Sequence, residues 1–373
     1  MQVAIVVNSL QSGGSERAAV RLAESFVNDG HKVTIATWNG EIDFYALDER
    51  ITRISIGDFF HHKGFRLPII GYRFGGLGKF FNLIKFRKQI QELKPDVVIA
   101  IEALVGSIMA ISLAMSRIPV IVSERVNPDP HVYKPHVIAR LARPFIYKRL
   151  ATCSVQTEGF ANWVLENWKV SATVTPNLIP TSWITNSKSF DLNNMKIVSI
   201  GRVEPQKGFD ILLSAWERLD LAKNDWRLEI IGSQNNSNYL SELLSLGDGK
   251  VCFSFPTHQV SELLDSSTIF ISCSRFEGFP NVVLEALSRG VPTIAATSTD
   301  IIKDWADAGA LITYEPEDVE TLEELIKSLM DSPETLEKLS KQAIAVAKNY
   351  TWEKVGQSWY RAIDQSIKQK NRR

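Results

Sequence analysis

Short apolar runs alternate with amphipathic stretches of helix length along the whole 373-residue chain. A buried parallel strand has a continuous apolar sequence, and regular alternation with helices is typical of βαβ units. The alternation begins again near residue 196, so we predict an α/β protein with two doubly wound parallel sheets. The predicted strands are residues 3–8, 32–37, 96–101, 119–124 and 152–157, then 196–201, 227–232, 251–256, 268–273 and 292–297.

A linker is predicted between the two halves of the chain. Residues 176–194 (PNLIPTSWITNSKSFDLNN) follow neither the strand nor the helix period and are rich in Pro, Asn and Ser. We therefore predict an N-terminal domain over 1–180 and a C-terminal domain over 181–350, and residues 351–373 are expected to form a helix that crosses back to the first domain. Ligands of such domains bind at the carboxyl ends of the strands, so a cleft there is the expected site.

Composition narrows the possible protein classes. Hydrophobic residues make up 45% and charged residues 23%, as in globular proteins, and no apolar run approaches the roughly 20 residues that span a bilayer. The N-terminal MQVAIVVNSL lacks a basic start and a cleavage site, which predicts a buried strand rather than a signal peptide. The three cysteines lie apart, in or beside apolar segments, so reduced core thiols and a cytoplasmic location are expected. They are Cys153, Cys252 and Cys273.

A glycine pair follows the first predicted strand. Gly13 and Gly14 precede a helix that Ser15 could cap. Backbone N–H groups at such a turn can approach an anion at the helix N-terminus. The spacing is not the GxGxxG of dinucleotide-binding proteins, and a tight turn without a ligand is the alternative explanation.

Two basic residues lie in the loop that follows the first predicted strand of the second half. In the stretch IGRVEPQKGFDILLSAW, Arg202 comes just after a strand and Lys207 just before a helix. Two cations that converge on one site can neutralise a diphosphate, which helps where a diphosphate departs as an anion. The alternative is an exposed loop with ordinary surface charges.

Two carboxylates lie on either side of a later loop-to-helix junction, in SCSRFEGFPNVVLEALSRG. Glu277 falls in the loop and Glu285 about one turn into a helix that Asn281 would cap and Gly290 would end. Both acids can then border the cavity in front of the helix, together with the backbone of residues 279–281. The competing interpretation of an acid near a helix N-terminus is simple stabilisation of the helix dipole.

Taken together, these motifs resemble a known family. GGSERAA near the N-terminus, the GR-x4-K spacing, PNLI at 176–179 and EGFPNVVLEA resemble the retaining family 4 glycosyltransferases. The resemblance covers nearly the whole chain and implies a GT-B fold, with two Rossmann-like domains facing a central cleft. It also implies transfer of a sugar from a nucleoside diphosphate, UDP by family frequency, to a hydroxyl of a bacterial surface polysaccharide or lipid-linked oligosaccharide.

The resemblance assigns separate partners to the two acids. Glu285 would accept hydrogen bonds from the nucleotide ribose, and Glu277 would face the donor sugar. Arg202 and Lys207 would bind the diphosphate. Both acids would thus hold one donor, unlike the acid and nucleophile of a glycosidase, which flank one glycosidic bond. The remaining donor contacts would come from Gly13, Gly14, Phe279, Pro280 and Asn281.

A further acidic candidate lies in the first half. Many family members carry a histidine that faces the donor sugar, and here the corresponding loop is SERVNPDPH, residues 123–131, with Glu124 and Arg125 at that position. Three roles for Glu124 are open: contact with the acceptor hydroxyl, positioning of the donor, or a structural pair with Arg125. His131 is the alternative residue near the acceptor.

No metal or other cofactor is expected. The chain contains no Asp-x-Asp, and no His or Cys cluster has the spacing of metal ligands. Cations and a helix dipole can stabilise a departing diphosphate directly, so the sequence predicts metal-independent transfer.

The acceptor side is expected to contact a membrane. Residues 1–180 contain 21 Lys and Arg against 15 Asp and Glu, an excess of six positive charges. Segments 59–91 and 131–151 mix basic and large apolar residues and contain no acid. Such segments suit an anionic bilayer or a lipid pyrophosphate, which predicts a peripheral protein on the cytoplasmic face of the inner membrane. Nucleic acid is a weaker candidate because no nucleic-acid-binding motif is present.

Two other functions would preserve the same fold. A sugar-nucleotide epimerase lacks support from the combination of GR-x4-K with the two acids. A silent nucleotide-sugar-binding or scaffold subunit would have lost the charged site. All four charged residues of the donor site are present, which favours an enzyme: Arg202, Lys207, Glu277 and Glu285.

Overall fold

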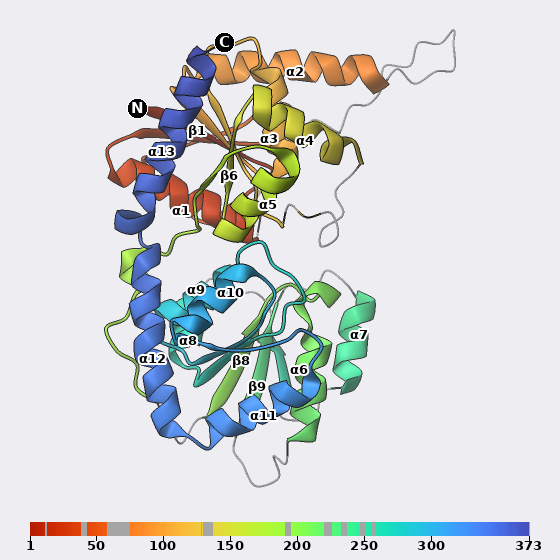
Figure 1. Ribbon diagram of the computed structural model, residues 1–373, viewed down its shortest axis with the longest axis vertical. Coiled ribbons are helices and arrows are strands. Elements are labelled where there is room, and N and C mark those ends of the chain that lie inside the picture. The colour runs from red at the N-terminus through yellow and green to blue at the C-terminus, as the bar shows by residue number, and fades with distance from the viewer. Residues whose placement is uncertain are drawn as a thin grey trace. The chain divides into compact units, whose positions relative to one another are not determined.

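The computed structural model places two compact units, Met1–Leu178 with Val355–Arg373, and Ile179–Lys354. Each is built on one sheet of parallel strands with helices on its faces, as Figure 1 shows. The predicted α/β fold with two doubly wound sheets is confirmed. The structure describes residues 1–11, 13–38, 43–57, 75–127, 129, 137–190, 195–219, 226–232, 237–246, 251–254 and 259–372.

The first unit contains a seven-stranded sheet in the order β3-β2-β1-β4-β5-β6-β7. The five predicted strands are present, and two further strands at the sheet edges were missed. Both are short and only partly buried, so neither has the continuous apolar run of a central strand. The strands are β1 (Gln2–Val7), β2 (Lys32–Thr37), β3 (Thr52–Ser55), β4 (Val97–Ile101), β5 (Val120–Ser123), β6 (Thr152–Val155) and β7 (Ala172–Val174).

Helices cover both faces of this sheet. One core packs the strands against α2–α5 through residues such as Phe86, Ile108 and Ile146. The long C-terminal helix α13 is bonded to two strands, because Gln365 and Gln369 accept hydrogen bonds from side chains of β7 and β6 at 2.6 and 2.8 Å. The helices are α1 (Gly14–Asn28), α2 (Gly75–Glu92), α3 (Ala103–Ser112), α4 (Val137–Arg149), α5 (Glu158–Trp168) and α13 (Trp352–Asn371).

The second unit contains a six-stranded sheet in the order β10-β9-β8-β11-β12-β13. Its five predicted strands are present, and the edge strand β13 was missed because it has three residues, two of them only half-buried. The strands β8 and β11 are neighbours, so the loops that follow them leave the same edge of the sheet. The strands are β8 (Lys196–Ile200), β9 (Arg227–Ile231), β10 (Val251–Ser254), β11 (Ile269–Ser272), β12 (Thr293–Ala296) and β13 (Ile312–Tyr314).

Apolar cores lie on both faces of the second sheet. Phe209, Trp216 and Ile326 belong to the core under α6 and α11, whereas Phe279 and Trp305 belong to the core under α8–α10. The α-helices are α6 (Phe209–Arg218), α7 (Ser237–Leu246), α8 (Val260–Asp265), α9 (Asn281–Ser288), α10 (Asp300–Asp307), α11 (Val319–Met330) and α12 (Pro333–Ala347), and the short 3₁₀ helices are η1 (Thr181–Trp183), η2 (Pro205–Lys207) and η4 (Lys348–Tyr350).

Some local predictions need correction. Helix α1 begins at Gly14 with Gly13 as its N-cap, so Ser15 is not the cap. Helix α9 begins at Asn281 with Pro280 before it, and no side chain caps it. Gly290 ends α9 in the left-handed region at φ 66°, as predicted.

The three cysteines are unpaired thiols, as expected. Cys153 and Cys273 are buried, and burial raises the pKa of both thiols, that of Cys273 to about 12. Cys252 is exposed on β10, at the edge of the second sheet, so its assignment to the core was wrong.

Candidate functional site

The centre of the candidate site is an ion pair in the second unit. Lys207 lies in η2, on the loop after β8, and Glu277 lies on the loop after β11. The Lys207 Nζ and Glu277 Oε1 atoms are 2.6 Å apart, and the two side chains are 17% and 12% exposed. Because β8 and β11 are adjacent parallel strands, residues 70 positions apart in sequence meet at the carboxyl edge of the sheet.

Two glycines allow the loops at this edge to approach closely. Gly208 has φ 65°, and a Cβ atom there would lie 2.1 Å from the carbonyl oxygen of Cys273. A Cβ atom on Gly232, just after β9, would lie 1.8 Å from the carbonyl oxygen of Gly201. Larger residues at either position would push the loops apart.

Arg202 occupies the same loop but is more accessible. Its side chain is 49% exposed and forms an ion pair with Glu204 at 3.3 Å. It also donates to Gln206 Oε1 at 3.3 Å. The family resemblance implies that Arg202 and Lys207 bind the same diphosphate. The structure places both on one loop but pairs Lys207 with Glu277, a contact that sequence reasoning did not foresee.

Helix α9 begins at Asn281, four residues after Glu277. The Phe279 ring is 5% exposed and packs edge-on against Trp305 and Tyr350, so it anchors the start of the helix in the core. The first turn of any helix presents backbone N–H groups that favour anions. Glu285, one turn in, is fully buried, so the two acids of the predicted site have very different environments.

The glycine turn in the first unit contacts a tyrosine. Gly13 donates its N–H to the Tyr45 hydroxyl at 3.2 Å, and that hydroxyl donates to Gly13 O at 3.0 Å. A Cβ atom on Gly13 would lie 2.2 Å from Glu16 Oε2. The turn is therefore held by Tyr45, a residue to which no motif pointed.

Glu124 lies at the end of β5 and is completely buried. It forms an ion pair with Arg143 of α4 at 3.2 Å and accepts a hydrogen bond from the Tyr147 hydroxyl. Burial raises the pKa of Tyr147, and the neighbouring Glu124 raises it further. The expected alternative pair with Arg125 does not form, because Arg125 donates to Asn177 instead. His131 lies outside the described residues.

Potential metal ligands are scattered in the described part of the chain. Among those residues, no group of three or more His, Cys, Asp or Glu side chains could hold a metal ion. The described residues near Lys207 and Glu277 therefore include no metal centre of this kind.

Two family profiles match the chain in succession. Residues 12–183 match the family described as "Glycosyltransferase Family 4", and residues 184–346 match "Glycosyl transferases group 1". The chain belongs to the family 4 glycosyltransferases of GT-B type. Lys207 and Glu277, on the loops after β8 and β11, both lie within the second match.

Relatives of this glycosyltransferase cover most of its length. An uncharacterized glycosyltransferase of Haemophilus influenzae is 27% identical over 95% of this chain and 97% of its own. A Campylobacter jejuni enzyme is 27% identical over 85% of this chain and 86% of its own. That enzyme is named GalNAc-alpha-(1->4)-GalNAc-alpha-(1->3)-diNAcBac-PP-undecaprenol alpha-1,4-N-acetyl-D-galactosaminyltransferase.

Solved structures share the GT-B fold. HepE from Anabaena, in complex with UDP and glucose, superposes with a TM-score of 0.79 over 97% of this chain and 99% of that one, at 15% identity. The agreement over both units shows that this glycosyltransferase has the GT-B fold.

Proposed function

We propose that the protein is a retaining, metal-independent transferase that moves a sugar from UDP to a hydroxyl of a lipid-linked bacterial polysaccharide or oligosaccharide. The observation that carries the proposal is the meeting of Lys207 and Glu277 at one sheet edge, with Arg202 on the same loop and the α9 N-terminus next to it. The names of relatives support the substrates: HepE is solved with UDP and glucose, and the Campylobacter enzyme is named for an undecaprenol-linked acceptor.

The chemistry of the proposed site follows from its charges. Lys207 and Arg202 neutralise the diphosphate as it departs, so no general acid is required. Glu277 holds the donor sugar, and Glu285 accepts hydrogen bonds from the ribose. The bond between the sugar and the diphosphate breaks, and the acceptor hydroxyl attacks the oxocarbenium-like centre from the face that the diphosphate leaves. The proton of that hydroxyl passes to the departing diphosphate. The backbone contacts of the donor are assigned to Gly13, Gly14, Phe279, Pro280 and Asn281.

A screen of nucleotide sugars tests this function. Thermal stabilisation and sugar release are measured with UDP, GDP and ADP sugars, each with and without EDTA. We expect UDP sugars to raise the melting temperature most and to be turned over equally in EDTA. NMR of the product formed on an isolated lipid-linked acceptor should show the anomeric configuration of the donor. Activity that EDTA abolishes and Mg²⁺ or Mn²⁺ restores, or an inverted product, would refute the corresponding part of the proposal.

We further propose that the face formed by α2, α3 and α4 contacts an anionic membrane that carries the acceptor. Exposed apolar side chains lie on these three helices or at their ends, among them Ile84, Met115 and Phe145, which are 50%, 85% and 60% exposed. Figure 1 shows the helices next to one another, and Arg87 of α2 donates to Met115 O just beyond α3.

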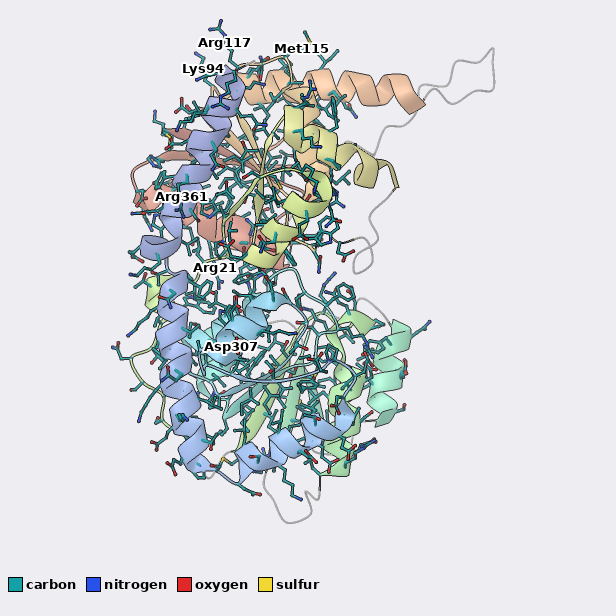
Figure 2. The ribbon with its side chains drawn as sticks, viewed as in Figure 1. Arg21, Lys94, Met115, Arg117, Asp307 and Arg361 are labelled. Atoms are coloured by element: carbon teal, nitrogen blue, oxygen red, sulfur yellow. The ribbon has the colours of Figure 1, made fainter. Side chains whose placement is uncertain are left out.

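Basic residues accompany these apolar side chains. Lys85, Lys88, Lys148 and Arg149 are exposed on α2 and α4. In Figure 2, Met115 and Arg117 lie at the same end of the first unit as Lys94. Mixed basic and apolar surfaces suit anionic bilayers. Within the described parts of the chain, no helix is both long and apolar enough to cross a membrane. Residues 59–74 and 131–136 of the predicted basic segments lie outside the described part of the chain.

Vesicle sedimentation tests the membrane contact. The double variant Lys85→Glu with Lys88→Glu should bind phosphatidylglycerol vesicles about 30-fold more weakly, since each lysine near an anionic surface contributes about 1 kcal/mol. The matched variant Lys338→Glu with Lys348→Glu, on exposed positions of the second unit, should bind like wild type. Equal binding of wild type to phosphatidylcholine and phosphatidylglycerol vesicles would disprove electrostatic attachment.

A further inference from the structure

The Arg275 side chain, next to the candidate site, contacts two carboxylates and a backbone carbonyl. It follows β11 and precedes Glu277 by two residues. Its guanidinium contacts both carboxylate oxygens of Asp210, at 3.0 and 2.8 Å, and both of Glu317, at 2.5 and 3.1 Å. Bidentate pairs between a guanidinium and a carboxylate are stronger and more specific in geometry than single hydrogen bonds.

Arg275 and its neighbours also bind the loop that carries Lys207. The guanidinium donates to the Pro205 carbonyl oxygen, and the Arg275 backbone N–H donates to Gln206 O at 2.8 Å. In return, Gln206 donates from Nε2 to Phe276 O at 2.9 Å. Besides the Lys207–Glu277 pair, three hydrogen bonds therefore connect the loop after β8 to the loop after β11, and all three involve residues within two positions of Lys207 or Glu277.

The ion pair with Asp210 also connects Arg275 to α6, the helix that follows Lys207. Asp210 lies in the first turn of α6, where Tyr239 of α7 donates to its Oδ1 at 2.6 Å. The hydrogen bond to Asp210 is the main cause that raises the pKa of Arg275, so the guanidinium stays charged. The side chain thereby joins four segments: η2, α6, the loop after β11 and the turn before α11 that holds Glu317.

We infer that Arg275 is a positioning residue for the donor diphosphate, which holds the loop of Arg202 and Lys207 at the sheet edge without itself contacting the substrate. This inference rests on the proposed function, in which the loop of Arg202 and Lys207 binds the donor diphosphate. Without Arg275, the Pro205 carbonyl and both carboxylates lose their shared partner. Lys207 then loses its fixed position opposite Glu277, although its charge remains.

A suitable control is available in the same unit. Arg289 contacts both oxygens of Asp265, at 2.7 and 2.6 Å, and a backbone carbonyl, Trp183 O, at 2.6 Å. Its side chain is 18% exposed, against 27% for Arg275. Arg289 lies at the opposite end of α9 from Glu277, so its removal perturbs a comparable network away from the Lys207 loop.

Hydrogen exchange tests the positioning directly, with no substrate present. In Arg275→Ala, the amides of Lys207 and Gly208, which donate to Glu204 O and Pro205 O, should exchange at least about tenfold faster than in wild type. Arg289→Ala should leave these two amides unchanged. Unchanged exchange in Arg275→Ala would overturn the inference whatever the protein binds.

Binding of UDP tests the consequence for the site. Arg275→Ala should weaken UDP about tenfold and uridine, which lacks phosphate, less than about twofold, because charge-assisted hydrogen bonds act on the diphosphate. Arg275→Lys should behave like Arg275→Ala, since the three donors of a lysine ammonium cannot replace the five contacts of the guanidinium with both oxygens of two carboxylates and a carbonyl. Equal weakening of UDP and uridine would overturn the inference, as would normal UDP affinity in either Arg275 variant.

A double-mutant cycle with Lys207→Ala completes the test. If Arg275 acts through Lys207, its removal should weaken UDP less than about twofold when Lys207 is already absent. Effects that simply add would show that Arg275 acts independently and would refute the inference. A wild-type protein that binds no nucleoside diphosphate would instead refute the proposed donor, while the exchange result would still show whether Arg275 holds the loop.

Discussion

Replacing Lys207 by alanine is expected to reduce kcat/KM for sugar transfer by about 10²- to 10³-fold, the usual loss when one preorganised donor to a developing negative charge is removed. Lys207 is the cation held deepest at the sheet edge, with 17% of its side chain exposed, whereas 49% of Arg202 is exposed. A partly desolvated cation stabilises a departing diphosphate more than a solvated one. Steady-state kinetics with the donor identified in the screen will measure the loss.

Two controls separate the role of Lys207 from general damage to the unit. Lys196 also pairs with a glutamate, Glu229, at 3.3 Å and with 19% of its side chain exposed, but at the amino end of β8. Lys196→Ala should keep kcat/KM within about threefold of wild type, since a partly exposed pair contributes little. Glu277→Gln should lower turnover but retain affinity for bare UDP, because Lys207 remains. Normal turnover in Lys207→Ala would refute a role for Lys207 in stabilising the departing diphosphate.

Removing the Glu124 carboxylate is expected to destabilise the first unit by about 3–5 kcal/mol, the typical cost of leaving one member of a buried ion pair alone. Arg143 is 1% exposed and Glu124 is fully buried, so neither charge can be solvated in place. Tyr147 would also lose its acceptor. Urea unfolding of Glu124→Ala and wild type, followed by circular dichroism, gives this difference in the free energy of unfolding.

The matched control for Glu124 is a more accessible pair in the same unit. Asp43 contacts Arg53 through both oxygens, at 2.9 and 2.8 Å, but the side chains are 30% and 22% exposed. Asp43→Ala should therefore cost about 0–1 kcal/mol. A Glu124→Ala protein that unfolds like wild type but has lost transfer activity would contradict the structural role and restore Glu124 as a candidate contact for the acceptor.

The sequence was sufficient for most of the fold because burial of a parallel strand leaves a local signal. All ten predicted strands are present, and each end lies within two residues of the prediction. The strands it missed, β3, β7 and β13, lie at sheet edges, where only part of each strand is buried and the apolar run disappears. Partial solvation thus removes the pattern on which strand prediction depends.

The candidate site was predictable to a lesser extent. Spacing after predicted strands placed Lys207 and Glu277 at sheet ends, but it did not indicate their contact. Glu124 was predicted at the end of a strand, where an acid can face a ligand. Its partner Arg143 comes 19 residues later on α4, and no local pattern indicates that this helix turns the arginine toward the core. Arg275 belonged to the quoted motif and still received no role, because its partners are 42 and 65 residues away.

The sequence by itself therefore determined which residue types follow which strands, and with them the two-sheet GT-B fold and the family. Only the tertiary structure decided which charges meet: Lys207 with Glu277, Arg275 with Asp210 and Glu317, and Glu124 with Arg143. The physical reason is the difference in range between the two kinds of interaction. Burial of apolar surface follows a period of a few residues along the chain, whereas an ion pair or hydrogen bond requires its atoms within a few ångströms, which packing of distant segments alone determines.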